Sequence, residues 1–197
     1  NAMMKNTAFA ISLLCTLSII TNTASASDDK NPLTLDIQTT VELGTCMATL
    51  QTTAGTGLTS VAFGDVYKPE LSNKSKIQSF EMAITNCAGL QDNKADITLV
   101  PNGTCAGTTP GANFANTTAD GAKATSVEVW TGTPDAGGTQ FNCTQQNVFS
   151  QDVSQASGNA KVIVPLTARM AIEPGHTIQD VTAGVFTSRA TFVVAYK

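Results

Sequence analysis

Cysteines are the side chains in this sequence whose type and number most clearly predict chemistry. Five cysteines occur in the 197 residues, and one of them, Cys15, lies in an apolar stretch near the N-terminus. The other four are Cys46, Cys87, Cys105 and Cys143. An even number is typical of disulfide bonding in an exported chain, and four cysteines allow three pairings. The sequence therefore predicts two disulfides without choosing among the pairings.

Neither an active site nor a metal site is predicted. The cysteines form no C-x-x-C pair, and the only histidine, His176, follows the turn Glu173-Pro174-Gly175, where a solvated side chain is usual. No G-x-S-x-G motif occurs, and the carboxylates form no recognisable pair. We therefore expect no cofactor, no metal and no enzymatic activity. A secreted enzyme or inhibitor remains an alternative, and it would show a complete, self-sufficient fold.

The N-terminus predicts export. Residues 1–3 resemble a cloning scar before a natural start at Met4. Lys5 supplies a positive charge, residues 9–20 are apolar, and Ala24-Ser25-Ala26 matches the A-x-A pattern of signal-peptide cleavage. The apolar stretch is shorter than the ~20 residues that cross a bilayer. We expect a signal peptide over residues 4–26.

Composition and periodicity predict an all-β fold. Only 13% of the residues are charged, the net charge is -4, and no Lys/Arg cluster occurs, so nucleic acid is not an expected partner. Apolar residues alternate with polar ones along seven or eight short segments separated by turns such as Asn102-Gly103. This pattern favours a single β-sandwich, most plausibly Ig-like.

Residues 101–146 form the most irregular part of the sequence. They are rich in Gly, Thr and Asn and are bracketed by Cys105 and Cys143. A disulfide there would close a loop of about 40 residues and contribute roughly 4 kcal/mol in the chain-entropy model. We expect a stapled surface excursion, with a receptor-binding loop as the alternative. Trp130 is expected to be a core or edge aromatic rather than a sugar platform.

Both ends of the proposed domain carry unusual strands. The segment AGVFTSRATFVVAYK ends the chain as an alternating strand, which would leave an exposed sheet edge. Residues 31–42 are extended and alternating, and they precede the first cysteine of the domain. They would form either an ordinary first strand or a strand that fills a groove in another copy.

Four segments together resemble the chaperone-usher pilin family, the subunits of type 1-like fimbriae: LTLDIQTTVELGTC, VAFGDV, FEMAITNCAGL and AGVFTSRATFVVAYK. The resemblance rests on their order and spacing and covers nearly all of residues 33–197. It implies an incomplete Ig-like sandwich that lacks its last strand, with a groove beside the C-terminal strand. A neighbouring subunit would complete the sandwich by donor-strand complementation.

The resemblance also assigns roles to residues. Residues 27–43 would be a donor-strand extension and residues 44–197 the pilin domain. The donor side chains would be Leu33, Leu35, Ile37, Thr39 and Val41. The edge bound by the chaperone and by the donor would include Phe186, Phe192, Val194, Tyr196 and Lys197. The implied disulfide joins Cys46 to Cys87, which leaves Cys105 and Cys143 as the second pair.

Thr39 departs from the family pattern. Seven residues before the first cysteine of the domain the family usually has glycine, which lets the donor strand lie close over the groove. Either the acceptor groove is roomier here, or the donor register differs by two residues. A one-residue slip would instead turn Asp36 inward, which argues for a single register.

The predicted function is that of a structural subunit of a bacterial surface fimbria, supporting cell adhesion. Expected partners are other fimbrial subunits in a homo- or hetero-polymer, a periplasmic chaperone, an outer-membrane usher and a host receptor. The chain would be exported through the periplasm to the cell surface. The alternative is a minor or one-domain adhesive subunit that binds its receptor through residues 101–146.

Overall fold

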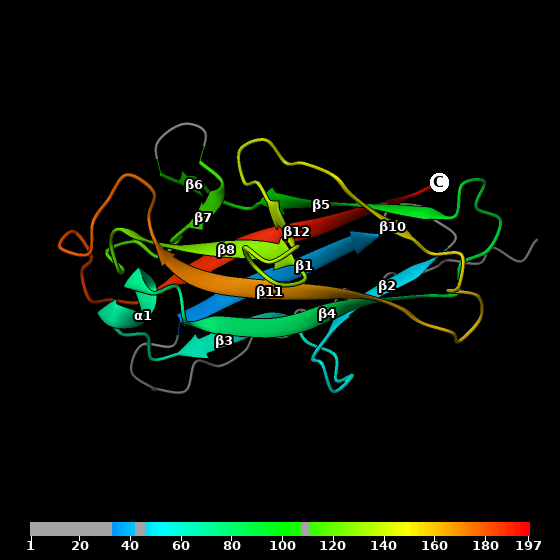
Figure 1. Cartoon of the computed structure of the whole chain (residues 1–197), viewed down its shortest axis with the longest axis horizontal. Helices are drawn as coiled ribbons and strands as arrows, with labels where there is room; N and C mark the ends of the chain where they lie inside the picture. Colours follow the sequence, from blue (N-terminus) through cyan, green and yellow to red (C-terminus); the bar gives the residue numbers. More distant parts are fainter. Residues whose placement is uncertain (1–32, 42–45, 108–110) are drawn as a thin grey trace, which may run out of the picture.

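A computed structural model describes residues 33–41, 46–107 and 111–197, which form two facing β-sheets (Figure 1). The first sheet has the strand order β10-β5-β12-β1-β3. Its strands are β1 (Leu33–Val41), β3 (Ser60–Gly64), β5 (Lys94–Pro101), β10 (Phe149–Asp152) and β12 (Thr187–Tyr196). All neighbours are antiparallel except β1 and β12, which run parallel.

The second sheet has the order β2-β4-β11-β8-β7-β6, and β9 also pairs with β8. Its strands are β2 (Met47–Gln51), β4 (Ile77–Thr85), β6 (Cys105–Ala106), β7 (Asn113–Ala115), β8 (Thr125–Thr131), β9 (Thr139–Phe141) and β11 (Val162–Ile172). The predicted all-β, two-sheet sandwich is therefore confirmed, whereas its Ig-like topology stays a prediction.

Alternating apolar residues build the core between the sheets. On β4 the large buried residues are Phe80, Met82 and Ile84, and on β5 the buried residues are Ala95, Ile97 and Leu99, each at every second position. This is the period-two alternation that strands require, since successive side chains point to opposite faces. Ala83 of β4 is buried as well. Burial of these side chains provides the main driving force for folding.

Residues 101–146 do not form the irregular surface loop that the sequence predicted. They contain β6, β7, β8 and β9, which extend the second sheet instead of leaving it. Phe141 of β9 is buried, and its ring lies 5.5 Å from the ring of Phe192 on β12 in an edge-to-face arrangement. Strands of two or three residues carry too little alternation to be recognised in a sequence, which explains the difference.

The residues just before β12 are anchored by close backbone contacts. The Asn116 side-chain amide donates to the carbonyl oxygens of Ala122 and Val185, and its oxygen accepts from the amides of Thr118 and Thr187. A side chain at Gly121 would bring its Cβ within 2.3 Å of the Val185 oxygen. Glycine is therefore required there, and the N-terminal end of β12 is held in place.

One short helix, α1 (Lys68–Ser72), connects β3 to β4 and was not predicted. Pro69 lies in its first turn, where a missing amide costs nothing, and the Tyr67 amide donates to the Glu70 carboxylate. Leu71 is buried and joins the core. A single turn is too short to show helical periodicity, so the sequence signal was only the proline and the acidic residue.

The predicted cloning scar and signal peptide, over residues 1–3 and 4–26, lie outside the described residues. Within the described ranges, no helix is long and apolar enough to cross a membrane. The division into a donor segment and a pilin domain stays a prediction.

Candidate functional site

The strand β1 lies in the gap between β12 and β3, and β12 is therefore not an edge strand as the sequence suggested. It runs parallel to β12 from the pair Thr34 and Thr187 to the pair Val41 and Val194. It runs antiparallel to β3 over Leu33–Asp36 only. Figure 1 shows β1 and β12 side by side with their arrows pointing the same way. The chain thus fills, with its own N-terminal strand, the position predicted for a strand from another molecule.

The inward face of β1 carries the predicted donor residues. Leu33, Leu35 and Ile37 are 7%, 0% and 2% exposed and belong to the common core. Full burial of one such side chain contributes about 1.5 to 3 kcal/mol, so these three contribute roughly 5 to 9 kcal/mol before ordering costs. The alternation of β1 therefore matches the groove in this register.

The outward face of β1 is polar and contributes little to its binding. Gln38 is exposed, and the Asp36 carboxylate accepts a 3.1 Å hydrogen bond from Nε of Arg189 on β12. Both side chains are more than a third exposed, and surface ion pairs of this kind contribute about 0 to 1 kcal/mol. The ion pair between Asp36 and Arg189 is compatible with only this register of β1, but it contributes little to the stability of its attachment.

Thr39 continues the inward series but fits the core poorly. It pairs with Phe192, and its hydroxyl oxygen is buried without a hydrogen-bond partner among the described residues. The backbone of Val41 pairs with Val194, while the side chain of Val41 lies outside the described residues. Among the side chains of β1 that the structure describes, the buried apolar ones are those of Leu33, Leu35 and Ile37.

The residues predicted at the edge of the groove have different surroundings. Phe186, Phe192 and Val194 are completely buried in the core. Tyr196 is partly buried and packs against the core, and its hydroxyl has no hydrogen-bond partner among the described residues. Burial disfavours the phenolate and raises the pKa of Tyr196 to about 12. These side chains form the apolar wall of the β12 side of the groove.

Lys197 is fastened to β5 through its backbone and its side chain. Its backbone amide donates to the carbonyl of Lys94, and its carbonyl accepts from the Lys94 amide. Its ammonium group forms an ion pair with Asp96, which lowers the pKa of that carboxyl. Pairing along β5 therefore continues to the last residue.

Two disulfides are present. One joins Cys46 to Cys87, and the other joins Cys105 to Cys143. This is the pairing that the family resemblance implied. The first disulfide ties the residue before β2 to a position just beyond β4, and the second ties β6 to the residues after β9.

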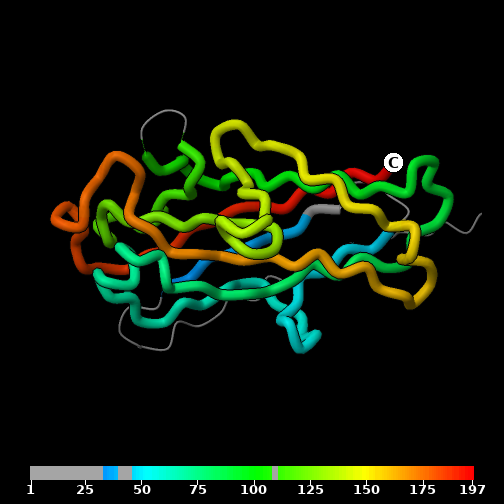
Figure 2. Tube along the Cα trace, in the orientation of Figure 1, coloured from blue at the N-terminus to red at the C-terminus, as the bar shows by residue number. Residues whose placement is uncertain are grey.

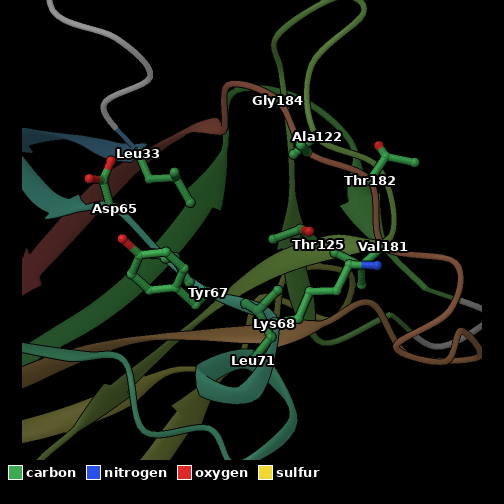
Figure 3. A pocket seen from close by; sticks show the side chains of 12 residues that line it. Leu33, Asp65, Tyr67, Lys68, Leu71, Ala122, Thr125, Val181, Thr182 and Gly184 are labelled. Carbon is green, nitrogen blue, oxygen red and sulfur yellow. The ribbon is translucent and has the colours of Figure 1, made fainter.

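A mostly apolar pocket of about 300 Å³ lies where β1 begins (Figure 3). Leu33 and Leu71 contribute from one side, and Val181, Thr182 and Gly184 contribute from the segment that precedes β12. Tyr67 at its rim is strongly exposed. The sandwich is therefore hollow beside Leu33, the first residue of β1.

The outer face of the second sheet carries a buried pair of charged residues with two exposed charged partners. Arg169 on β11 lies opposite Glu128 on β8, and its Nε donates to the Glu128 carboxylate at 2.7 Å. Lys74 and Asp135 add further ion pairs at 2.8 Å and 2.7 Å. Buried charges are tolerated when they are paired in this way. The charges are balanced, so this group serves as a structural clamp.

Trp130 belongs to the same outer face. Its indole Nε1 donates to Glu128, and the Arg169 guanidinium carbon lies 5.4 Å from the centre of its ring. It is half-buried rather than part of the core. The contacts of its ring and its nitrogen are intramolecular, as for an edge aromatic.

The only histidine of the sequence, His176, lies at the surface. His176 is about half exposed and lies 3.7 Å from Asp180, whose pKa is lowered mainly by hydrogen bonds from Thr177. Over the ranges that the structure describes, no group of three His, Cys, Asp or Glu side chains could hold a metal ion.

Comparison with known proteins decides the family. No family model matches the sequence. The "Uncharacterized fimbrial-like protein YadL" of Escherichia coli (strain K12) is 45% identical over 168 residues, which cover 82% of this chain and 83% of that protein. The chain belongs to the fimbrial-like proteins. The family of this fimbrial-like protein is non-enzymatic.

One solved structure shows a weaker likeness to this fimbrial-like protein. The crystal structure of the CupB6 tip adhesin from Pseudomonas aeruginosa aligns with a TM-score of 0.41 at 12% identity. The match covers 60% of this chain and 34% of the adhesin, so the chain spans about a third of the adhesin's length.

Sequence reasoning missed the second wall of the groove. β3 was recognised as a strand, but nothing in its sequence shows that it flanks β1. Tyr67, Leu71 and Val181 at the hollow entrance were also missed, because they are distant in sequence and meet only in the fold. Arg189 had a usable signal, since an exposed charge within an apolar strand indicates the outward face.

Proposed function

We propose that this fimbrial-like protein is a structural subunit of a surface fimbria, polymerised when β1 of one copy fills the groove between β12 and β3 of another. The observation that carries the proposal is the position of β1. Without it, β12 and β3 would each have an unpaired edge, and Phe192 and Val194 would lose their cover. A sandwich with such a gap needs a strand, and any copy of the chain can supply one.

The direction of the strands supports exchange between copies. Because β1 is parallel to β12 and antiparallel to β3, the two walls run antiparallel to each other. A donor strand in either direction therefore pairs with both walls. Parallel pairing is slightly less stable than antiparallel pairing, and β1 pairs in parallel along its longer wall. A donor strand that runs in the opposite direction would pair antiparallel with β12, and the more stable type of pairing would then extend along the longer of the two walls.

Strand donation also accounts for the proposed assembly partners. A periplasmic chaperone would fill the groove with its own strand and bind the C-terminal carboxylate on Lys197 until an outer-membrane usher exchanges it for the next subunit. The fibre would then lie at the cell surface. The buried wall formed by Phe186, Phe192 and Val194 requires such protection, since an exposed apolar edge promotes aggregation.

The proposal is tested by incubating the purified chain and following polymers by sedimentation and electron microscopy. Ile37→Asp should abolish polymer growth, because a carboxylate would enter the apolar groove. Gln38→Asp places the same carboxylate on the exposed face of β1 and should leave growth intact. Equal growth by the two variants would contradict strand donation by β1.

A further inference from the structure

The two halves of β1 are held differently in the groove. Residues 34–36 pair with β12 on one side, and Leu33–Asp36 pair with β3 on the other. Beyond Asp36 the pairing with β3 ends, and the last link on that side is a 3.2 Å hydrogen bond from the Ile37 amide to the Thr59 carbonyl. The second half of β1 is therefore held mainly by β12.

A large cavity borders this second half. It has a volume of about 890 Å³, and its lining includes Thr39, Leu50, Leu58 and Ala190. Leu58 comes from the connection between β2 and β3, the cyan segment that projects from the sandwich in Figure 2. Thr39 thus borders open space where Leu35 is enclosed by protein.

Thr39 adds a polar mismatch at this position. It pairs with the completely buried Phe192, and its hydroxyl oxygen is itself buried without a partner among the described residues. A buried hydroxyl that lacks a hydrogen bond destabilises the state that buries it, whereas an apolar group of the same shape does not. The hydroxyl regains hydrogen bonds to water when β1 leaves the groove.

We propose that Thr39 determines how readily β1 leaves its own groove, and thereby how readily the subunit opens to receive a strand from another copy. This inference rests on the proposed function. Loose pairing, the cavity and the unpaired hydroxyl coincide within the same half of β1. Release begins at this end, while the half that contains Leu33 and Leu35 is the last to separate.

The test measures uptake of a labelled synthetic peptide of residues 31–42 by the purified full chain. Thr39→Val removes the hydroxyl and keeps the shape of the side chain. It should slow uptake about tenfold, which corresponds to about 1.4 kcal/mol. Thr39→Ser retains a hydroxyl and should take up the peptide at least as fast as the wild type. Thr98→Val makes the same change on the outward face of β5 and should stay within about twofold of the wild type.

The outcomes separate this inference from the proposed function. Uptake by the wild type and by Thr39→Val at the same rate would overturn the role of Thr39 and leave strand exchange standing. Uptake by none of the proteins would overturn strand exchange and the inference together. Urea unfolding provides a second readout, because Thr39→Val should be at least as stable as the wild type. A lower stability of Thr39→Val than of the wild type would contradict the proposal that the unpaired hydroxyl destabilises the attachment of β1.

Discussion

The two sheets of the sandwich complete their apolar faces by different means. In the first sheet the strand β1 is inserted between β12 and β3 and is held there by side-chain burial and backbone hydrogen bonds. In the second sheet a disulfide joins Cys105 to Cys143, and the buried pair of Glu128 and Arg169 joins β8 to β11. The attachment of β1 is therefore non-covalent, whereas the second sheet also contains covalent cross-links.

This difference indicates a division of labour. A subunit that exchanges a strand needs one sheet that can open without unfolding the remainder. The clamp around Arg169 and the Cys105–Cys143 disulfide both lie in the sheet that does not take part in exchange. The following predictions test that separation, beginning with the largest expected effect.

Ile37→Asp should have the largest effect on the first sheet. It replaces a buried apolar side chain by a carboxylate and should lower the free energy of unfolding by about 5 kcal/mol. Urea denaturation measures the loss, and hydrogen exchange of β12 amides should increase as β1 leaves. Gln38→Asp should change neither quantity appreciably. Equal losses for the two variants would mean that β1 does not occupy this register.

Removing the Cys105–Cys143 disulfide should weaken the second sheet without changing strand exchange. The double variant Cys105→Ser, Cys143→Ser opens a separation of 38 residues and should lose about 4 kcal/mol by chain entropy. The variant Cys46→Ser, Cys87→Ser opens a separation of 41 residues and should lose a similar amount. Only the Cys46–Cys87 disulfide is close in sequence to the end of β1, so only its loss should alter peptide uptake. Altered peptide uptake in the Cys105→Ser, Cys143→Ser variant would contradict the proposal that the second sheet is independent of strand exchange.

Breaking the buried ion pair should have a somewhat smaller effect. Glu128→Ala leaves the Arg169 guanidinium buried with Asp135 as its remaining carboxylate and should cost about 3 kcal/mol. Asp135→Asn changes a mostly exposed partner and should cost clearly less. Thermal unfolding compares the two variants. A larger loss for Asp135→Asn would show that Asp135, and not Glu128, is the main partner of Arg169.

Tyr196 should produce the smallest effect, visible at high pH. Its pKa of about 12 in the folded state exceeds the ordinary value of 10.0, so the unfolded chain loses this proton first as the pH rises. The stability contributed by Tyr196 is complete below about pH 10 and is lost as the pH rises to about 12. Tyr196→Phe should reduce this decline, and at pH 7 it should be neutral or stabilising because the hydroxyl has no partner. An unchanged decline would show that Tyr196 is not buried.

Much of the architecture was predictable because strands leave a local signature. The alternation in β5 and β12 reflects burial on one face, and that periodicity is contained in each segment by itself. The inward series Leu33, Leu35 and Ile37 was predicted for the same reason. The short strands β6, β7 and β9 were not predicted, because they depend on pairing with neighbours rather than on their own pattern.

The sequence by itself determined which face of β1 is apolar, that the fold is all-β, and that an apolar strand ends the chain. Only the tertiary structure decided that β1 lies between β12 and β3, because alternation describes a face and does not name its partner. It also decided that the hydroxyl oxygen of Thr39 is buried without a hydrogen bond among the described residues and that Arg169 pairs with Glu128. These contacts join residues far apart in the chain, and only the packed sheets bring them within reach.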